Sequence, residues 1–355
     1  MQIERHIVFW IAALVVFVGL LWLLSPILLP FVVGLAVAYL LDPLANRLAK
    51  RGVSRLIAAS IILGGFVLIV AVLLLLIVPV LAKQLTGFID NAPAYAQRLQ
   101  SLLSEAQHPW LKRIVGDNLG GNDKSAGDLM NQAMGYVSNF LGSLWTRGQA
   151  LISLFSLVII TPVVAFYLIA DWDRMVGAVD RLVPLPQRET VRGLGREIDA
   201  TIAAYVRGQS GVCLILGSYY ALGLTLAGLS FGLLIGVVSG LVSFIPYVGS
   251  LTALVLSLGV AVAQFFPDWT PIVIVAGVVL VGQFIEGNVL SPKLVGHSVG
   301  LHPVWLMFAL FAFSYLFGFV GLLLAVPLAA AAGVLIRFAV RRYRDSLFYT
   351  GGRPV

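Results

Sequence analysis

Apolar stretches of near-membrane length recur along this chain, and they restrict its fold more than any other feature. Spanning the hydrocarbon core of a bilayer takes about 20 predominantly apolar residues in an α-helix. Residues 56–81 satisfy this requirement, and shorter apolar stretches occupy most of the C-terminal half. The sequence is 60% hydrophobic and 11% charged, whereas soluble domains are about 45–50% apolar and about 25% charged. The predicted fold class is therefore all-α, in a polytopic integral membrane protein.

Several of these stretches are too short for a full crossing or are interrupted by Pro or Gly. We therefore expect about eight transmembrane helices together with broken or re-entrant helical hairpins. A small extramembrane helical layer is also expected, with Asn91 and Pro93 marking a break between its helices. The predicted regions are N-terminal membrane helices (1–81), extracytoplasmic amphipathic helices (82–149), a membrane helix (150–170), a cytoplasmic amphipathic basic helix (171–209), a C-terminal membrane bundle with helical hairpins (210–340) and a cytoplasmic tail (341–355).

The basic residues set the expected orientation. The formal net charge is +7, and the Lys and Arg residues lie between hydrophobic stretches. This placement is typical of a topology signal and of contact with membrane lipids, and nucleic acid is not an expected partner. The clusters at 47–55 and 337–344 place both termini in the cytoplasm, which requires an even number of crossings. The basic helix at 171–209 would lie either on lipid headgroups or packed against the protein.

One polar cluster interrupts the apolar C-terminal half, and it is the candidate substrate or ion site. Gln283 and Glu286 are three residues apart and share a helix face. Asn288, Pro292 and Lys293 follow, and the proline removes a backbone donor near the helix end. Ionisable groups inside a membrane are costly and indicate function by default. The alternative is a Glu286–Lys293 pair that only fixes a loop.

Two Pro- and Gly-containing breaks are candidate hinges of helical hairpins. The first contains Pro246 and Gly249, and the second contains Gly321 and Pro327. Paired interrupted segments often flank the binding site of a transporter. Two ordinary turns would give the same pattern.

Two further groups concern packing and gating. Glycines spaced by four residues predict a close helix-packing face or a sliding surface, and they are Gly228, Gly232, Gly236 and Gly240. Complementary polar groups at the ends of two apolar stretches predict a gate or a fixed clasp, and they are Asp171, Asp173, Arg207 and Gln209.

Enzyme and cofactor signatures are not supported by the sequence. Residues 296–300 fit a nucleophile-elbow pattern around Ser298, but the elbow requires a strand–turn–helix setting. His297 and His302 lack further ligands at metal-binding spacing. No catalytic residue, metal site or cofactor is predicted, and nucleotide-binding loops are absent from the sequence, so transport would be passive or ion-coupled.

Five motifs occur in order along most of the chain and carry a family resemblance. They span 167–171 (YLIAD), 205–209 (YVRGQ), 245–249 (IPYVG), 286–293 (EGNVLSPK) and 296–303 (GHSVGLHP). Together they resemble the autoinducer-2 exporter family of bacterial permeases. The resemblance implies a multi-pass transporter of the inner membrane, acting as a homo-oligomer, with a pentameric ring as one arrangement. It also implies efflux of the furanosyl quorum-sensing signal, or Na⁺/H⁺ exchange in some members.

Three functional hypotheses follow. The first is a secondary or passive permease that exports a small polar solute by alternating access, with the Glu286 cluster near the solute. The second is a Na⁺/H⁺ antiporter in which Glu286 carries the proton. The third is an intramembrane hydrolase that uses Ser298.

Overall fold

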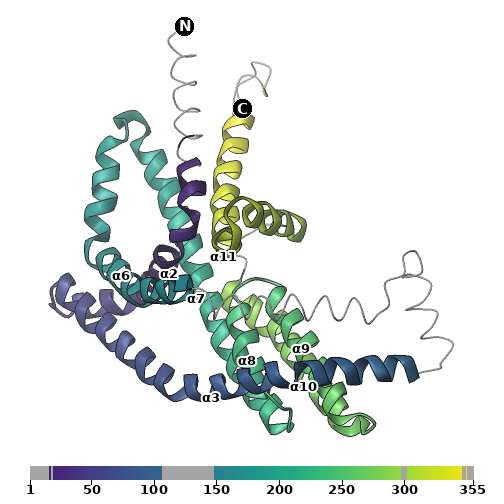
Figure 1. The fold of residues 1–355 in the computed structure, drawn as a ribbon. Helices are drawn as coiled ribbons and strands as arrows, with labels where there is room; N and C mark the ends of the chain where they lie inside the picture. The colour runs from purple at the N-terminus through teal and green to yellow at the C-terminus, as the bar shows by residue number, and fades with distance from the viewer. Residues whose placement is uncertain (1–15, 17–18, 106–147, 297–301, 346–348, 350–355) are drawn as a thin grey trace. The chain divides into compact units, whose positions relative to one another are not determined.

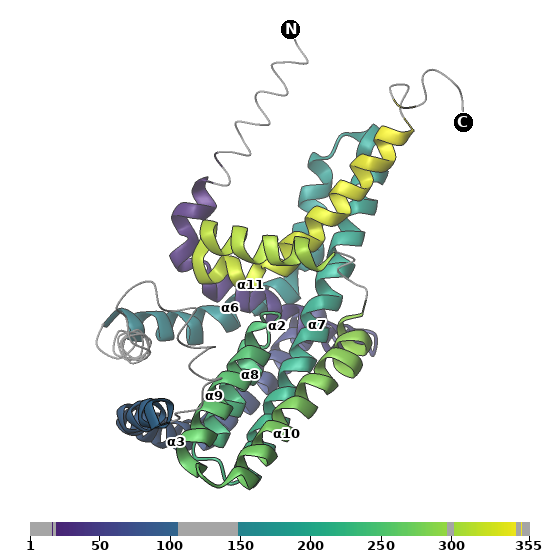
Figure 2. The same ribbon diagram turned by 90° about the vertical axis from the view of Figure 1, so that its right-hand side faces the viewer.

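The computed structural model describes residues 16, 19–105, 148–296, 302–345 and 349, and the regular structure in these residues is helical (Figures 1 and 2). Its longer elements are α2 (Leu29–Ala49), α3 (Arg55–Glu105), α6 (Gly148–Leu182), α7 (Arg188–Leu226), α8 (Gly232–Val242), α9 (Val248–Phe265), α10 (Trp269–Ile285) and α11 (Pro303–Arg344). Short elements are η1 (Ser25–Ile27), η2 (Leu185–Gln187) and the π-helix η3 (Glu286–Val295). Six stretches of described helix are long and apolar enough to cross a membrane. The predicted all-α, polytopic membrane class is confirmed.

Helix α3 differs from the expected arrangement because it is a single element of 51 residues. It crosses the predicted limit at residue 81 and continues through both Pro79 and Pro93, so the expected break at Asn91 and Pro93 is wrong. Proline removes one backbone hydrogen bond and favours a kink. A membrane helix nevertheless tolerates proline when neighbouring groups form hydrogen bonds to the freed backbone groups. Residues 106–147, with the second half of the predicted extracytoplasmic layer, lie outside the described residues.

The predicted basic helix is also not a separate element. Helix α6 extends twelve residues past the expected limit at 170, to Leu182. Helix α7 joins the basic segment to the next apolar stretch without interruption. The chain reverses between the two helices at Pro184 and η2, where proline sets the backbone for a turn.

The chain divides into two compact units, each built from several segments. The first comprises Met1–Leu68, Phe155–Ser210 and Ser291–Val355, and the second comprises Ile69–Leu154 and Gly211–Leu290. The core of the first unit contains apolar side chains from α2, α3 and α6, namely Ala38, Leu41, Ala45, Ala59, Leu63, Ala165 and Ile169. Many of these residues are small. Small interfacial residues allow membrane helices to approach closely, because lipid provides little hydrophobic drive for helix association.

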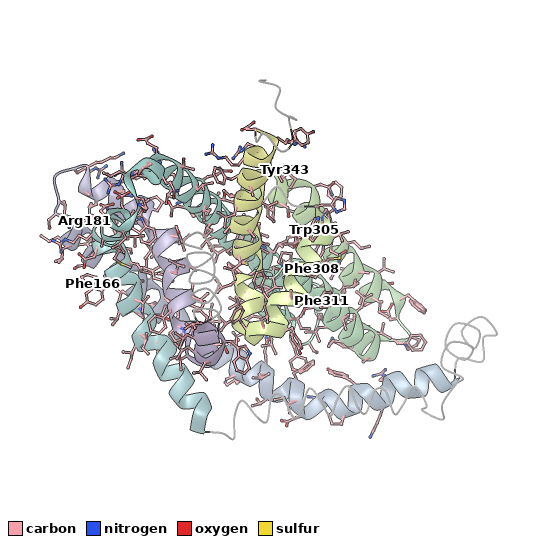
Figure 3. The ribbon with its side chains drawn as sticks, turned by 90° about the horizontal axis from the view of Figure 1, so that it is seen from above. Phe166, Arg181, Trp305, Phe308, Phe311 and Tyr343 are labelled. Carbon is pink, nitrogen blue, oxygen red and sulfur yellow. The ribbon has the colours of Figure 1, made fainter. Side chains whose placement is uncertain are left out.

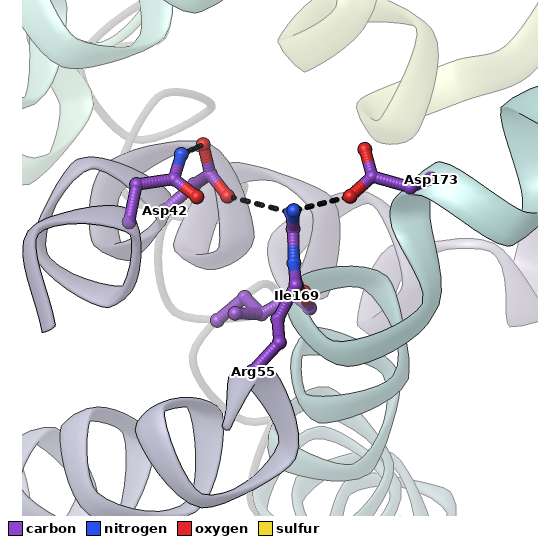
Figure 4. A network of polar contacts seen from close by, with 5 residues as sticks. Asp42, Arg55, Ile169 and Asp173 are labelled. Carbon is purple, nitrogen blue, oxygen red and sulfur yellow. Dashed lines mark hydrogen bonds and ion pairs between the residues drawn. The ribbon is translucent and has the colours of Figure 1, made fainter. Parts of the chain in front are cut away.

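Arg55, the first residue of α3, connects three helices of the first unit (Figure 4). Its Nε donates to the carbonyl oxygen of Ile169 at 2.9 Å. Its guanidinium pairs with Asp173 of α6 and, at 3.4 Å, with Asp42 of α2. Asn46 donates to the other oxygen of Asp42 at 2.7 Å. One cation and two carboxylates therefore join α2, α3 and α6.

Helix α11 has a break at Gly318, three residues before Gly321 of the predicted hinge. Gly318 has φ 60° and ψ −139°, which divides the element into two helical segments. A Cβ on Gly321 would overlap the carbonyl oxygen of Phe313, so this position requires glycine at the bend. Pro327 is buried in the second segment. The first segment carries exposed aromatic side chains, including Trp305, Phe308 and Phe311 (Figure 3), as expected for a lipid-facing surface.

The second unit contains a hairpin of two unequal helices. Helix α8 has 11 residues, a length of about 16 Å, which is roughly half of the hydrocarbon thickness. The chain reverses at Pro246 and Tyr247, the latter with a left-handed φ of 68°, and α9 returns with 18 residues. Gly249 lies against Ser243, whose backbone a Cβ would overlap. Helix α9 packs against both α8 and α10.

Three of the four predicted packing glycines hold α8 against α7. A Cβ on Gly236 would overlap the backbone of Ala221, and one on Gly240 would overlap the backbone of Gly217. A Cβ on Gly232 would lie 2.8 Å from the carbonyl carbon of Leu224. Gly228 is different, because it lies in the α7–α8 turn with φ 74°. It provides turn geometry, and it is not part of the packing face.

Side chains satisfy the backbone groups at the turns of the second unit. The amide of Gln264 accepts from Ser230 N and donates to the Gly228 carbonyl, at 2.8 and 2.9 Å. The Gln84 side chain of α3 accepts from Leu234 N at 2.9 Å. Arg98 of α3 donates to the Phe266 carbonyl at 2.9 Å. Backbone groups at helix ends therefore find partners within the protein.

The close α7–α8 contact predicts opposite effects for one substitution at two glycines. Gly236→Ala should destabilise the protein by about 1–3 kcal/mol through overpacking. Gly259→Ala in α9, where a Cβ meets nothing within 4 Å, should be neutral or stabilise by up to about 1 kcal/mol through helix propensity. Thermal unfolding of the purified protein measures both effects. Equal stabilities of the two variants would contradict the packing role of Gly236.

The three-helix contact of Arg55 generates a second prediction. Arg55→Gln should lower the unfolding free energy by about 1–2 kcal/mol, because it leaves Asp42 and Asp173 without their cation. Arg51→Gln is the matched control, since Arg51 is exposed. Denaturant titration of the two variants compares them directly, and a smaller loss for Arg55→Gln than for Arg51→Gln would refute the assignment.

Candidate functional site

The predicted polar cluster begins where α10 changes into a π-helix. Residues Glu286–Val295 form η3, which contains Pro292. Gln283 and Glu286 are half-buried, whereas Asn288, Pro292 and Lys293 are exposed. Asn288 donates to the Phe284 carbonyl at 3.1 Å. π-Helical segments are rare in proteins as a whole. Where they do occur, they are frequently part of a functional site.

Helix α7 provides the neighbours of Glu286 in the second unit. The Glu286 carboxyl lies within electrostatic reach of Cys213 and Tyr220. Tyr220 is fully buried, and its ring packs on Gly282, one helical turn before Glu286. The adjacent Tyr219 donates to the Val278 carbonyl at 3.0 Å. Close packing of α7 on α10 therefore positions Glu286 beside a buried tyrosine.

Two hydroxyls in this region are buried without a hydrogen-bond partner among the described residues. They are Tyr220 Oη and Ser239 Oγ. Ser239 of α8 lies between Gly236 and Gly240 in the sequence. Gly236 contacts Ala221 of α7, and Gly240 contacts the α7 backbone near Cys213. Both hydroxyls and the Glu286 carboxyl therefore lie along one stretch of α7. An unsatisfied buried donor costs about 1–3 kcal/mol, so such groups call for an explanation such as a ligand or water.

The structure thus extends the predicted cluster inward. Glu286 lies within electrostatic reach of Tyr220, and Tyr220 and Ser239 were not singled out by the sequence. A tyrosine and a serine inside apolar stretches are weak signals, because such hydroxyls usually bond to the preceding turn. Ser243 and Ser257 do so, with hydroxyls donating to the carbonyls of Ser239 and Ala253.

The residues of the predicted gate or clasp have different partners from those expected. Asp171 pairs with Arg174 at 3.0 Å, and Asp173 pairs with Arg55. Within the described structure neither aspartate pairs with Arg207. Gln209 is buried. Arg207 instead lines a cavity of the first unit.

The basic part of α7 packs in part against the protein. Arg192 donates two hydrogen bonds to Asp180 of α6, both at 2.7 Å, and Arg188 lies 3.8 Å from the same carboxylate. Arg337 of α11 pairs with Glu197 at 3.4 Å. The hydrogen bonds from Arg192 lower the pKa of the Asp180 carboxyl. The sequence allowed this basic segment to lie on lipid headgroups or to pack against the protein. Arg188, Arg192 and Glu197 contact other parts of the protein.

Within the described residues, no three His, Cys, Asp or Glu side chains are grouped as metal ligands. His302 caps α11, with its Nδ1 accepting from Val304 N at 3.3 Å. His297 and Ser298 lie outside the described residues.

Residues 11–341 match the family described as AI-2E family transporter. The chain belongs to this family. Similar proteins include the transport protein YrrI of Bacillus subtilis, 29% identical over 89% of this chain and 87% of the relative. The permease PerM of Escherichia coli is 30% identical over 94% and 93%. The AI-2 transport protein TqsA of Escherichia coli is 24% identical over 90% and 86%. An AI-2E family member is a membrane transport protein and not an enzyme.

The Asp180–Arg192 contact predicts an acid dependence of the α6–α7 hairpin. The lowered pKa means that this contact stabilises the folded hairpin fully above the ordinary pKa of aspartate, about 3.9, and that the stabilisation is lost as pH falls below it. Hydrogen-exchange protection of residues 171–200 should decline more steeply below about pH 4 than in Asp180→Asn. Asp171→Asn is the control, because Asp171 pairs within α6, and it should retain the wild-type acid dependence.

Proposed function

We propose that this protein is a secondary or passive permease that exports a small polar solute through the second unit by alternating access. The observation that carries the proposal is the pair of buried, unpartnered hydroxyls of Tyr220 and Ser239 along the same stretch of α7 as Glu286. In a membrane bundle these groups lower stability unless a ligand uses them. A solute with several hydroxyl groups would supply donors and acceptors to all three.

The hairpin of α8 and α9 supports the proposed transport pathway. Helix α8 contacts α7 through glycines, which allow the two helix backbones to approach closely. The turn at Pro246 and Gly249 ends α8 after 11 residues, so the hairpin reverses within the expected membrane thickness. Motion of this hairpin relative to α7 would change access to Ser239.

The proposed solute class includes the furanosyl signal autoinducer-2. Support comes from family membership and from the name of TqsA, which describes AI-2 transport. We further propose a bacterial inner-membrane location, cytoplasmic termini and a homo-oligomeric assembly. The basic clusters at 47–55 and 337–344 support the orientation.

The antiporter hypothesis predicts a different result for one variant. If Glu286 carries the proton, Glu286→Gln should abolish pH-driven Na⁺ exchange in proteoliposomes. If the protein exports a neutral solute, the same variant should retain part of the solute efflux, because the amide still donates and accepts hydrogen bonds.

The hydroxyl site is tested by solute flux together with stability. Tyr220→Phe and Ser239→Ala should each reduce autoinducer-2 efflux from proteoliposomes by about tenfold, the equivalent of one lost hydrogen bond of about 1.4 kcal/mol. Because the hydroxyls have no protein partner, thermal stability should be unchanged or higher in both variants.

Matched controls lie close by in the same unit. Tyr219→Phe removes a hydroxyl bonded to the Val278 carbonyl, and Ser257→Ala removes one bonded to the Ala253 carbonyl. Both should retain wild-type flux. If the Tyr220→Phe and Ser239→Ala variants both showed wild-type efflux, the proposed role of these hydroxyls in the transport pathway would be contradicted.

A further inference from the structure

A cavity of about 150 Å³ lies between α2, α6 and α7 of the first unit. Its polar lining consists of Tyr39, Asp42, Trp172, Asp199 and Arg207. Sites for drug-sized ligands occupy about 300–1,000 Å³. An occupant of this cavity is therefore a small molecule.

Helix periodicity explains why these side chains meet. Asp199, Ala203 and Arg207 follow one another at intervals of four residues, so they form one stripe along α7. On α2, Tyr39 and Asp42 are three residues apart and share a face in the same way. The small side chain of Ala203 leaves space between the carboxylate and the guanidinium. The cavity is thus a consequence of the α7 pattern.

The hydrogen bonds of the lining leave two opposite charges available. Tyr39 donates to one oxygen of Asp199 at 2.8 Å. Asp42 is already engaged by Arg55 and Asn46. In the part of the chain that the structure describes, the second Asp199 oxygen and the Arg207 guanidinium have no hydrogen-bond or ion-pair partner.

We propose that this cavity binds a small zwitterionic molecule. Its ammonium group lies at the free oxygen of Asp199, and its carboxylate lies at Arg207, whose planar fork suits carboxylate recognition. Trp172 and Tyr39, with ring centroids 6.1 Å apart, form an aromatic wall beside the ammonium group. A purely anionic ligand would face two carboxylates in the lining, and a purely cationic ligand would leave Arg207 unpaired.

This site goes beyond the proposed transport function and uses none of its residues. The transport proposal rests on Glu286, Tyr220 and Ser239, and the zwitterion site rests on Asp199 and Arg207. Binding at this cavity is measured without transport, so either proposal can fail alone.

Calorimetric titration of the full-length protein in lipid nanodiscs tests the ligand class. The zwitterionic probes are glycine, β-alanine and γ-aminobutyrate, whose charge separations differ. Butylamine, butyrate and ribitol represent the cationic, anionic and neutral classes. At least one zwitterion should bind at least tenfold more tightly than all three of the latter probes.

Variants assign the binding to the two charges. Asp199→Asn and Arg207→Gln should each weaken zwitterion binding at least tenfold, and Arg207→Lys should restore part of the affinity. Tyr39→Phe keeps the cavity and frees the Asp199 oxygen that accepts from the Tyr39 hydroxyl, so its affinity should be equal or higher, even if Asp199→Asn folds poorly. Arg196→Gln is the control, because Arg196 does not line the cavity.

Three outcomes would overturn the proposal. One is the absence of binding by every zwitterion. Another is zwitterion binding no tighter than that of butylamine, butyrate or ribitol. The third is wild-type affinity in a folded Arg207→Gln variant.

Discussion

Hydrocarbon offers no hydrogen-bond partners, and this constraint governs the structure more than any single contact. Every backbone group inside the membrane must be satisfied within the protein, which leaves helices as the principal element of such a chain. Where helices end, side chains replace the missing bonds. The Gln264 side chain forms hydrogen bonds to backbone groups of the α7–α8 turn, and the Gln84 side chain accepts one from the first turn of α8. The polar side chains near these turns are therefore part of the architecture.

The sequence predicted those features that depend on local pattern. Apolar length indicated the membrane class, and the structure has a break in α11 at Gly318 and a turn at Pro246 and Tyr247. Local pattern did not predict features that depend on distant partners. Arg55 pairs with Asp173, and the two residues are separated by 118 positions in the sequence. No rule of local spacing predicts such a pair. The continuation of α3 through Pro93 was missed for a related reason, because proline lowers helix propensity without forbidding a helix.

The candidate site was also predicted only in part. Glu286 and Gln283 are candidates from the sequence because charged and amide groups contrast with an apolar background. Tyr220 and Ser239 were not found from the sequence. They stand out because their buried hydroxyls have no hydrogen-bond partner among the described residues, and this can be seen only after α7, α8 and α10 are packed together. Glycines decide this packing. Gly282 admits the Tyr220 ring, and Gly236 and Gly240 bring α8 close enough to bury Ser239.

The charge cluster around Arg55 has a mechanical consequence for the first unit. A guanidinium shared by Asp42 and Asp173 resists entry into hydrocarbon, because charged groups are costly to place there. The cluster therefore joins the start of α3 to the C-terminal halves of α2 and α6 at one level. Sliding any one of these helices along its axis would pull the other two with it. Tilting of the three helices as one block is the motion that this anchoring leaves open.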